Sequence, residues 1–342
     1  MKYSLNIEVI PSLIDYLYQN DWIEDTVKVN ASLLKGGVSN RVVLLKFDDG
    51  ESWVLKQALD KLRVAGDWFS SPKRIFQEAE AMRWFEKYAP TDSVPKLIFE
   101  DQSQYILAME AIHPPFENVK TSLLTGDPSN SKYFFDAGAL LGNIHLQASR
   151  HSNDIPLLFQ DNQFFQTLRI EPYYLKTINA ISETDRFLKE LISETLEDRF
   201  TLVHGDFSPK NLLIKNNELI LLDHEVIHFG DGTFDLGFFI CHLLSKANHR
   251  PDFRTALIAG ASSFFEAYKS IFGELGKDRE FRVVRHTIAC LLARVCGLSK
   301  LEYLTANQRI RQQEVCMEMI QNTPQTINEF MEKINDLLNA KD

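Results

Sequence analysis

The sequence predicts an α+β protein of two lobes, in which a small antiparallel sheet is followed by a larger and mostly helical part. Short alternating segments separated by turn residues dominate the chain up to about Ile112, and longer segments with helical periodicity follow. A length of 342 residues suits about two lobes, and an apolar content of 44% can form a sizeable core. We therefore predict a first lobe over residues 1–112 and a second over residues 113–342.

The first lobe is expected to be a sheet with one long helix. Asp48-Asp49-Gly50 is a strong turn signal and predicts a hairpin between strands at Arg41–Phe47 and Ser52–Gln57. A helix is predicted over Asp67–Tyr88 by an apolar stripe made of Ile75, Ala79, Met82 and Phe85. A short amphipathic helix is expected over residues 8–20. The remaining strands are expected at Val27–Val29, Ser32–Lys35, Leu97–Glu100 and Tyr105–Met109.

In the second lobe the alternating pattern of strands stops. His113-Pro114-Pro115 and Gly126-Asp127-Pro128 mark a non-helical connection, and Met109–His113 is the expected hinge. Two short strands beside a loop at His204 are the only strands expected here. Helical periodicity predicts helices at Lys132–Ala148, Asp185–Glu197, Asp235–Ser245, Phe253–Ile271, Phe281–Leu298 and Arg309–Asn339, the last as one or two helices.

Composition and charge narrow the range of partners. The net charge of −10 argues against nucleic acid or an anionic membrane as the main partner. The acidic excess fits a groove for a cationic substrate only weakly, and ordinary solubility charge explains it more simply. The four cysteines form no C-x-x-C pair, so they are expected to be reduced thiols of a cytoplasmic protein. No secretory signal and no membrane-spanning stretch is visible, and a monomer or homodimer is expected.

The stretch His204-Gly205-Asp206-Phe207-Ser208-Pro209-Lys210-Asn211 carries the strongest functional signal. Asp206 and Asn211 lie five apart on a loop, and Asp223 ends the apolar strand behind them. This is the layout of a kinase-type phosphoryl-transfer site, in which one Asp positions the attacking hydroxyl while an Asn and a further Asp hold Mg²⁺. Turns that carry Asp or Asn are common, and they explain either segment alone equally well. Their order and spacing together favour the phosphoryl-transfer site.

A glycine turn in the first lobe suits phosphate binding. Gly36, Gly37, Ser39 and Asn40 join two strands, and paired glycines with free N–H groups can cradle phosphate. A Gly-Gly pair is more often a plain hairpin turn.

Lys56 ends the next strand. It either points to solvent, as most lysines do, or reaches the nucleotide and pairs with a helix glutamate. Glu78 shares the buried stripe of the long helix, whereas Glu80 lies on a more exposed face, so Glu78 is the preferred partner. We predict a Lys56–Glu78 salt bridge beneath a cleft between the lobes, because an unpaired buried carboxylate is costly.

Taken together, these motifs resemble the aminoglycoside phosphotransferase and choline kinase-like family of small-molecule kinases. The likeness runs from about residue 30 to 245. Its specific stretches are His204-Gly205-Asp206-x-x-x-x-Asn211, Leu222-Asp223-His224-Glu225 and Gly230-Asp231-Gly232-Thr233-Phe234-Asp235-Leu236. His-Gly-Asp in place of His-Arg-Asp, and Asp-His-Glu in place of Asp-Phe-Gly, separate the chain from ordinary protein kinases. The resemblance implies the bilobal, protein kinase-like form of the α+β fold.

The resemblance also implies a role for each matching residue. Asp206 would orient the acceptor hydroxyl or accept its proton, and Asn211 and Asp223 would coordinate Mg²⁺. Lys56 would hold the α- and β-phosphates of ATP or GTP, with Glu78 fixing its position.

Further roles concern the hinge and the catalytic loop. The base would dock at the hinge, beside Met109 and Ile112. Asp235 would be a buried acceptor that braces the loop backbone, although it could equally be the N-cap of the following helix. His204 would be a structural residue of the loop rather than a base, and His145 would pack beside it.

The chain departs from the related patterns in two places. Ser208 stands where protein kinases of similar layout carry a lysine two residues after the Asp. Lys210 either supplies the compensating charge or is a solvated surface lysine. Residues 113–131 have no obvious counterpart and are expected to be an insertion or cover on the substrate side.

The leading interpretation is a kinase that transfers the γ-phosphate of ATP or GTP, with Mg²⁺, to a hydroxyl of a small molecule. A catalytically silent nucleotide-binding module on the same fold is the alternative, and competent residues at every polar position of the machinery disfavour it. A protein kinase is disfavoured because no activation segment ending in Ala-Pro-Glu follows Asp235. The acceptor stays open: an aminoglycoside, choline, a methylthio-sugar, homoserine or another metabolite alcohol.

Polar residues of the last helices give the only hint of an acceptor site. They lie among apolar helical residues, and they are Arg285, His286, Arg294, Glu302 and Tyr303. Arg294 and Glu302 could face a cleft, and a structural ion pair between them is the simpler alternative.

Overall fold

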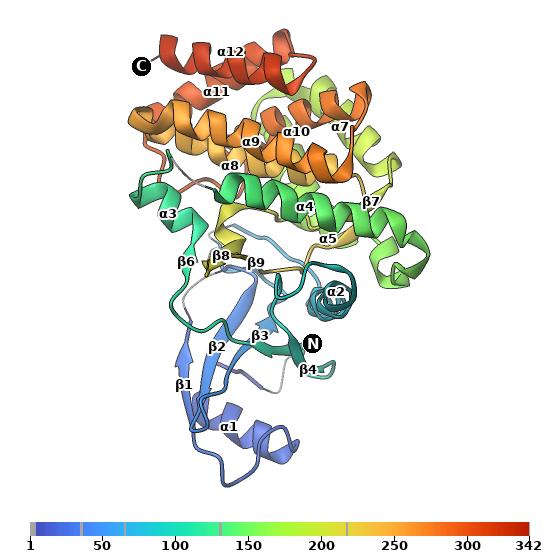
Figure 1. Ribbon diagram of the computed structural model, residues 1–342, viewed down its shortest axis with the longest axis vertical. Coiled ribbons are helices and arrows are strands. Elements are labelled where there is room, and N and C mark those ends of the chain that lie inside the picture. The colour runs from blue at the N-terminus through green and yellow to red at the C-terminus, as the bar shows by residue number, and fades with distance from the viewer. Residues whose placement is uncertain (1–4, 35–36, 65, 130–131, 217, 342) are drawn as a thin grey trace.

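The computed structural model describes residues 5–34, 37–64, 66–129, 132–216 and 218–341. An N-terminal part built on a sheet and a C-terminal part built of helices lie one above the other in Figure 1. This is the predicted α+β architecture. The lobe boundary at residue 112 stays a prediction, and the last strand of the sheet, β5 (Ile106–Glu110), ends just before it.

A five-stranded antiparallel sheet forms the centre of the N-terminal part, in the order β1-β2-β3-β5-β4. The strands that accompany β5 are β1 (Val29–Leu33), β2 (Asn40–Phe47), β3 (Ser52–Ala58) and β4 (Leu97–Asp101). The predicted hairpin is present as β2 and β3, with Lys46 opposite Ser52 beside the turn.

The two faces of this sheet are covered by different helices, because successive side chains of a strand point to opposite faces. On one face α1 (Ile10–Gln19) buries Leu13 in the cluster that contains Leu55. On the other face α2 (Arg74–Tyr88) buries Met82 in the cluster that contains Leu107. The second contact places α2, and Glu78 with it, beside the strands that border the C-terminal part (Figure 1).

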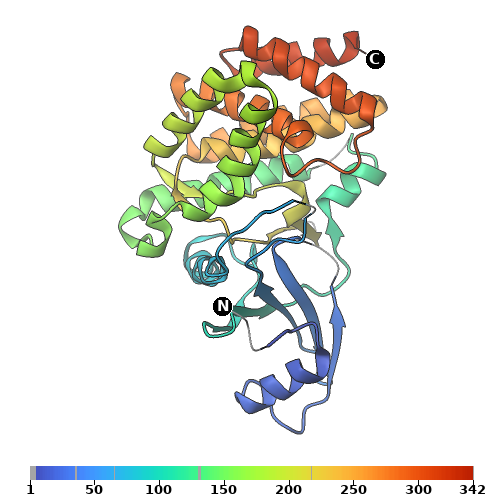
Figure 2. The same ribbon diagram turned by 180° about the vertical axis from the view of Figure 1, so that it is seen from behind.

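Long helices build the C-terminal part, in which α4 packs on α9 and α8 packs on α10. In Figure 2 the C-terminal helix α12 lies at the end of the molecule farthest from the sheet. The long helices are α4 (Tyr133–Arg150), α7 (Asp185–Glu197), α8 (Thr233–His249), α9 (Arg254–Phe272), α10 (Lys277–Cys296), α11 (Ala306–Gln321) and α12 (Ile327–Ala340).

Shorter elements complete this part. The short helices are α3 (Val119–Thr125), α5 (Gln163–Phe165), a π-helix (Gln166–Leu175) and α6 (Lys176–Ala180). Single 3₁₀ turns lie at Ser152–Asp154, Leu157–Gln160, Ser182–Thr184, Pro209–Asn211 and Pro251–Phe253. The strands are β6 (Glu117–Asn118), β7 (Thr201–Val203), β8 (Leu212–Lys215), β9 (Glu218–Leu221) and β10 (His228–Gly230), paired as β10-β7 and β6-β8-β9.

The predicted start of the long helix at Asp67 is wrong, since α2 begins at Arg74. Residues 68–70 run extended instead: Trp68 O accepts from Leu62 N at 2.9 Å, and Ser70 N donates to Asp60 O at 3.0 Å. Ser71 precedes Pro72, and a residue before proline disfavours the helical region. The spacing of apolar residues alone does not reveal that the helix begins only after Pro72.

Other predicted boundaries also change. The two strand pieces expected at Val27–Val29 and Ser32–Lys35 form one described strand, β1, and Lys35 lies outside the described residues. The expectation of only two strands near His204 is wrong, because five short strands, β6 to β10, form two small sheets in the described chain there. Strands of two or three residues are too short to show a period of two. The connection 113–131, expected without helix, contains α3.

Candidate active site

The loop between β7 and β8 holds its shape through backbone hydrogen bonds to one buried carboxylate. Asp235 accepts from His204 N at 2.6 Å and from Gly205 N at 2.8 Å, and its side chain is fully buried. This is the brace that the resemblance implies. The alternative, that Asp235 is an N-cap, is wrong because α8 begins at Thr233. His145 lies beside the same carboxylate, with Nε2 3.5 Å from Asp235 Oδ2.

Asp206 lies in this loop between two cations and an amide. Its Oδ1 is 3.0 Å from Arg169 Nη2, and its Oδ2 is 2.8 Å from Lys210 Nζ. Asn211 Nδ2 donates to Oδ2 at 2.9 Å. Burial alone would raise the pKa of Asp206, but Arg169 and Lys210 outweigh it and lower the pKa, so the carboxylate is ionised at neutral pH.

The predicted Lys56–Glu78 ion pair is present. Lys56 Nζ lies 2.6 Å from Glu78 Oε1 and 3.1 Å from Asp223 Oδ1. Lys56 therefore joins β3 and α2 of the N-terminal part to the segment that follows β9. Burial opposes its charge, but the carboxylates of Asp223 and Glu78 outweigh burial and raise the pKa of Lys56.

Asp223 has an unusual backbone and an available oxygen. Its φ is +70°, in a region that residues other than glycine seldom adopt. Burial would raise the pKa of Asp223, but Lys56 and Lys210 lower it well below its usual range. Within the described part of the chain, Lys56 is the ion-pair partner of Oδ1, and Oδ2 has no hydrogen-bond or ion-pair partner.

These donors fit a hard cation such as Mg²⁺. Asp223 offers a carboxylate oxygen and Asn211 an amide oxygen, which are the ligand types that Mg²⁺ prefers beside the oxygens of phosphate. Asn211 directs its amide nitrogen to Asp206, both to the main-chain oxygen at 3.0 Å and to the side chain, and this holds its amide in one orientation.

The glycine turn lies close to the same segment. Gly37 has φ +81°, which favours glycine, while Gly36 lies outside the described residues. Ser39 and Asn40 are buried, and Asn40 Nδ2 donates to Glu225 Oε2 at 3.0 Å. Arg74 Nε donates to the same oxygen at 3.1 Å. The amide nitrogen of Asn40 is therefore engaged with the segment of Asp223, and phosphate binding by this turn stays a prediction.

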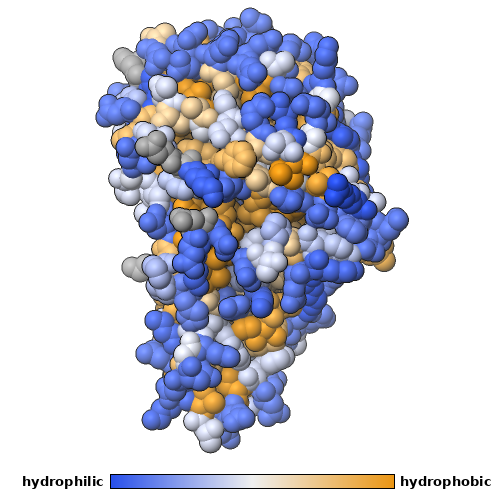
Figure 3. Space-filling model, in the orientation of Figure 1, coloured by the Kyte–Doolittle hydropathy of each residue, from blue (hydrophilic) through white to orange (hydrophobic). Residues whose placement is uncertain are grey.

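A cavity of about 400 Å³ opens between the sheet and the helical part. Lys56, Met109 and Ile112 all line it, so the structure brings the predicted hinge residues and the lysine to one cleft. Most of the other lining is apolar, including Val54 and Leu222. A mostly apolar cleft that includes a cation has the polarity that a nucleotide base and its phosphates require. Figure 3 shows apolar surface in the recess between the two parts of the molecule.

A family model described as the phosphotransferase enzyme family matches residues 30–271, the span that holds all of these features. The chain belongs to this family. The motifs predicted a family of phosphotransferases, and this match confirms it.

Known proteins are similar to this phosphotransferase at low identity. The methylthioribose kinase of Geobacillus thermodenitrificans is 26% identical over 254 residues, covering 65% of this chain and 62% of that protein. The methylthioribose kinase of Bacillus mycoides is 24% identical over 277 residues, covering 72% and 68%. The chain thus spans less than two thirds of the length of the first of these.

Solved structures share the fold. An amicoumacin kinase in complex with AMP-PNP and Ca²⁺ superposes with a TM-score of 0.59 at 16% identity, over 94% of this chain and 98% of that one. A choline/ethanolamine kinase family protein from Mesorhizobium loti superposes with a TM-score of 0.54 at 13% identity, over 95% of this chain and 99% of that one. In the described part of this phosphotransferase, no helix is long and apolar enough to cross a membrane.

Sequence reasoning missed two residues of the site and weighed a third too lightly. Arg169 reaches Asp206 from the π-helix, and Glu225 is clamped by Arg74. No local signal marks Arg169, because it lies far from the loop in sequence and inside a segment without helical periodicity. Lys210, for which a solvated position was one of two alternatives, pairs with Asp206.

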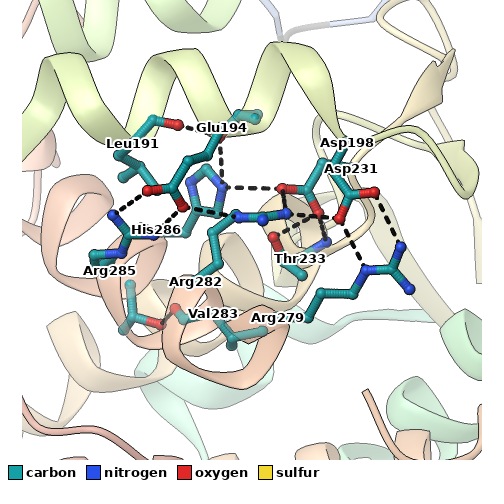
Figure 4. A network of polar contacts seen from close by, with 12 residues as sticks. Leu191, Glu194, Asp198, Asp231, Thr233, Arg279, Arg282, Val283, Arg285 and His286 are labelled. Atoms are coloured by element: carbon teal, nitrogen blue, oxygen red, sulfur yellow. Dashed lines mark hydrogen bonds and ion pairs between the residues drawn. The ribbon is translucent and has the colours of Figure 1, made fainter. Parts of the chain in front are cut away.

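The polar cluster expected on the last helices divides into two groups. Arg285 and His286 belong to a network of ion pairs and hydrogen bonds between α7, α10 and the segment after β10 (Figure 4). Arg294 and Glu302 do not pair with each other in the described chain. Arg294 donates to Ser299, and Glu302 forms its ion pair with Lys120 of α3.

Proposed function

We propose that this phosphotransferase moves the γ-phosphate of ATP or GTP to a hydroxyl of a small metabolite, with Asp206 as the base. The observation that carries the proposal is the setting of Asp206. Only 3% of the surface of Asp206 is exposed, and its carboxylate is ionised. Arg169 and Lys210 form ion pairs with its two oxygens, and Asn211 donates a hydrogen bond to it. A carboxylate fixed in this way is suited to orient one hydroxyl in line with a phosphoryl group.

The reaction follows from these positions. The acceptor hydroxyl donates its proton to Asp206 as its oxygen bonds to the γ-phosphorus, and the bond from that phosphorus to the bridging oxygen breaks, releasing the nucleoside diphosphate. Lys56, fixed by Glu78, would neutralise the α- and β-phosphates. Asn211 and Asp223 would hold Mg²⁺, which when bound would offset charge on the β- and γ-phosphates.

The apolar cleft supports a purine base at Met109 and Ile112, and the amicoumacin kinase of similar fold holds AMP-PNP. No described residue of this cleft distinguishes ATP from GTP, so both nucleotides are used in the experiment. The methylthioribose kinases among the relatives support a sugar-like alcohol as acceptor.

The test of the base is Asp206→Asn. We expect kcat to fall by about a hundredfold or more, because general-base catalysis by a positioned group contributes that much. Nucleotide release is measured with Mg²⁺, ATP or GTP, and a panel of metabolite alcohols. Turnover equal to wild type in the Asn variant would remove Asp206 from the mechanism.

The alternative of a silent nucleotide-binding module predicts a different result. AMP-PNP and Mg²⁺ would then bind to the wild type, yet no alcohol of the panel would raise nucleotide release above that of Asp206→Asn. Failure of the wild type to bind any nucleotide would contradict both assignments.

A further inference from the structure

Two buried cations lie on helices α8 and α10 in a part of the molecule that the proposed reaction does not use. Lys246 has 0% and Arg294 5% of its surface exposed. His242 connects them: its Nε2 accepts from Arg294 Nη2 at 2.9 Å, and its main-chain oxygen accepts from Lys246 Nζ at 3.1 Å. Tyr303 covers the group, with Lys246 Nζ 5.5 Å from its ring centre.

This cationic group lies near Arg169, the ion-pair partner of Asp206. The guanidinium of Arg294 is 5.1 Å from the ring centre of Tyr173 and 5.4 Å from that of Phe238. The guanidinium of Arg169 lies 5.7 Å from each of the same two rings. Arg169 in turn holds Asp206 at 3.0 Å. Arg294 and the base are therefore separated only by Arg169 and one pair of aromatic side chains.

The described residues place no carboxylate within ion-pair distance of this group: Glu302 acts on Lys246 and Arg294 from farther away and forms its own ion pair with Lys120. Among the described residues, neither Lys246 nor Arg294 has a carboxylate partner. Arg294 Nη1 donates to the Ser299 hydroxyl at 2.7 Å and to its main-chain oxygen at 2.8 Å, and both acceptors are neutral. Buried charges in proteins are normally paired, because an isolated one is expensive to hold out of water.

Two buried polar atoms of this group also lack hydrogen-bond partners. Arg294 Nε and the Tyr303 hydroxyl are buried and have no hydrogen-bond partner in the described chain. Burial and the neighbouring Lys120 lower the pKa of Lys246 to about 7, so this side chain is partly neutral near pH 7, and an approaching anion would favour its ammonium form. An anion that reached this group would offset the charge of Arg294 and accept from the two donors that have no partner.

We propose that the acceptor of this phosphotransferase carries an anionic group, a carboxylate or a phosphate, which Arg294 and Lys246 bind beside Asp206. The proposal rests on the proposed kinase function and narrows its substrate class. It favours hydroxy acids, sugar acids and sugar phosphates over neutral sugars, and it argues against polycationic aminoglycosides, which Arg294 and Lys246 would repel.

Helix α3 and its N-cap connect this group to the loop of Asp206. Asn118, the N-cap of α3, donates from Nδ2 to the main-chain oxygen of Lys210 at 2.7 Å. Lys120 of the same helix pairs with Glu302, the neighbour of Tyr303. The helix therefore bridges the catalytic loop and the loop that covers Lys246, which fits the expectation of a cover on the substrate side.

The first experiment compares acceptors that differ in charge but share a carbon skeleton. Nucleotide release is measured with Mg²⁺ and ATP for three groups of acceptors. The anionic acceptors are gluconate, ribonate, glycerate and ribose 5-phosphate. The neutral acceptors are the matched sugars and polyols together with methylthioribose, and the cationic acceptors are glucosamine and kanamycin. We expect the anionic members to have a kcat/KM at least about tenfold above their neutral matches, since a hydrogen bond to a charged group contributes that much or more. Equal or higher efficiency with neutral or cationic members overturns the proposal and leaves the kinase function intact.

The second experiment removes the cations. Arg294→Gln and Lys246→Met should each raise KM for the best anionic acceptor about 10- to 100-fold, with a smaller change in kcat. Arg294→Lys, which keeps the charge, should retain more of the affinity than Arg294→Gln. Lys189→Met is the matched control, because it removes an exposed lysine of α7 whose side chain is 65% exposed. An unchanged KM in both Lys246→Met and Arg294→Gln overturns the proposal and makes the two cations structural.

A binding measurement covers the case in which no anionic acceptor of the panel is turned over. With AMP-PNP and Mg²⁺ saturating the nucleotide site, malonate and phosphate should raise the unfolding temperature of the wild type above chloride at equal ionic strength, and less so for Arg294→Gln and Lys246→Met. No rise in the wild type, together with no anionic turnover, overturns the proposal. Absence of AMP-PNP binding would instead overturn the kinase function on which it rests.

Discussion

Gly205, between His204 and Asp206, has a backbone that only glycine adopts easily. Its φ is +74°, and a Cβ built on it would lie 2.6 Å from Cγ1 of Val226. Glycine therefore allows two things at once: the left-handed turn that presents Gly205 N to Asp235, and close packing of the segment that follows Asp223.

We predict that Gly205→Ala destabilises the protein by about 2 kcal/mol or more, because a left-handed alanine alone costs 1–2 kcal/mol and the contact with Val226 adds to it. Denaturant unfolding measures the loss. The double variant with Val226→Ala should be less destabilised than the sum of the two single variants, because the steric contact exists only when both side chains are present. Strict additivity would show that the contact is relieved elsewhere.

A neutral substitute at Asp223 can distinguish a role in metal binding from a role in folding. Asparagine tolerates a positive φ and has the same shape, but it has no charge for a metal or for Lys56. Lys56 keeps Glu78 as its partner in such a variant.

We predict that Asp223→Asn weakens binding of AMP-PNP with Mg²⁺ by at least about tenfold, as loss of a charged ligand contact implies. The unfolding midpoint without ligand should stay nearly unchanged. Titration calorimetry and thermal unfolding check the two parts. An earlier unfolding by several degrees with unaltered nucleotide affinity would make Asp223 a structural residue.

At the scale of elements, one network of charges holds α7, α10 and the segment after β10 together (Figure 4). Arg282 of α10 is its centre, at 3.3 Å from Glu194, 2.8 Å from Asp198 and 2.9 Å from Asp231. Asp231 is fully buried, so it depends on Arg282 for its charge to be tolerated. The segment of Asp231 leads directly into α8, which carries Asp235 and so braces the catalytic loop.

We predict that Arg282→Gln destabilises the protein by about 3–5 kcal/mol, the usual cost of removing one partner of a buried ion pair. Denaturant unfolding gives the value. Arg186→Gln is the control, since the Arg186–Glu190 pair of α7 is exposed to solvent and contributes little to stability. If the free energy of unfolding falls by the same small amount in both variants, the network does not stabilise the junction of these elements.

Across the whole molecule, buried histidines couple stability to pH. His228 is 4% exposed, and its Nδ1–H donates to the Val226 oxygen at 3.1 Å. Burial lowers the pKa of His228 to about 4 from an ordinary 6.5. Burial likewise lowers the pKa of His224 and His242. Below about pH 6.5 the unfolded chain therefore binds protons that the folded protein does not.

We predict that the stability contributed by these neutral histidines is fully present above about pH 6.5 and is lost as the pH decreases toward 4, by about 3 kcal/mol from His228 alone. The lowered pKa of Asp206 and of Asp231 adds a further loss below about pH 4, because those carboxylates must be protonated on unfolding. His228→Asn keeps a donor for the Val226 oxygen and cannot titrate. The slope of the unfolding free energy between pH 4 and 6.5 should drop by about 1.4 kcal/mol per pH unit in this variant, and an unaltered slope would contradict the assignment.

The net charge of −10 shows how little a sum over the whole chain says about one site. It suggested, weakly, a groove for cations. Arg169 and Lys210 contact Asp206 directly, and Arg294 and Lys246 lie buried nearby, an arrangement that the net charge does not indicate.

Much of the fold could be predicted because its signals are local. The hairpin of β2 and β3 follows from one turn, and α7 occupies the predicted Asp185–Glu197 because an amphipathic stripe repeats along it. The predictions fail where a local signal is too short or is interrupted, as at β10 and at Pro72.

The sequence by itself determined the identity and spacing of the predicted site residues Asp206, Asn211 and Asp223, and it marked Glu78 as the buried glutamate of its helix. These relations depend on turns and on the repeat of a helix, which neighbouring residues specify. The pairing of Glu78 with Lys56 was predicted with the help of the resemblance to small-molecule kinases, and the structure confirms it. Only the tertiary structure decided that Arg169 holds Asp206 and that Arg294 and Lys246 lie together without a carboxylate. The physical reason is that periodicity reveals which side chains are buried, whereas the partner that each one meets is set by how separate helices pack, and that packing depends on contacts distributed over the whole chain.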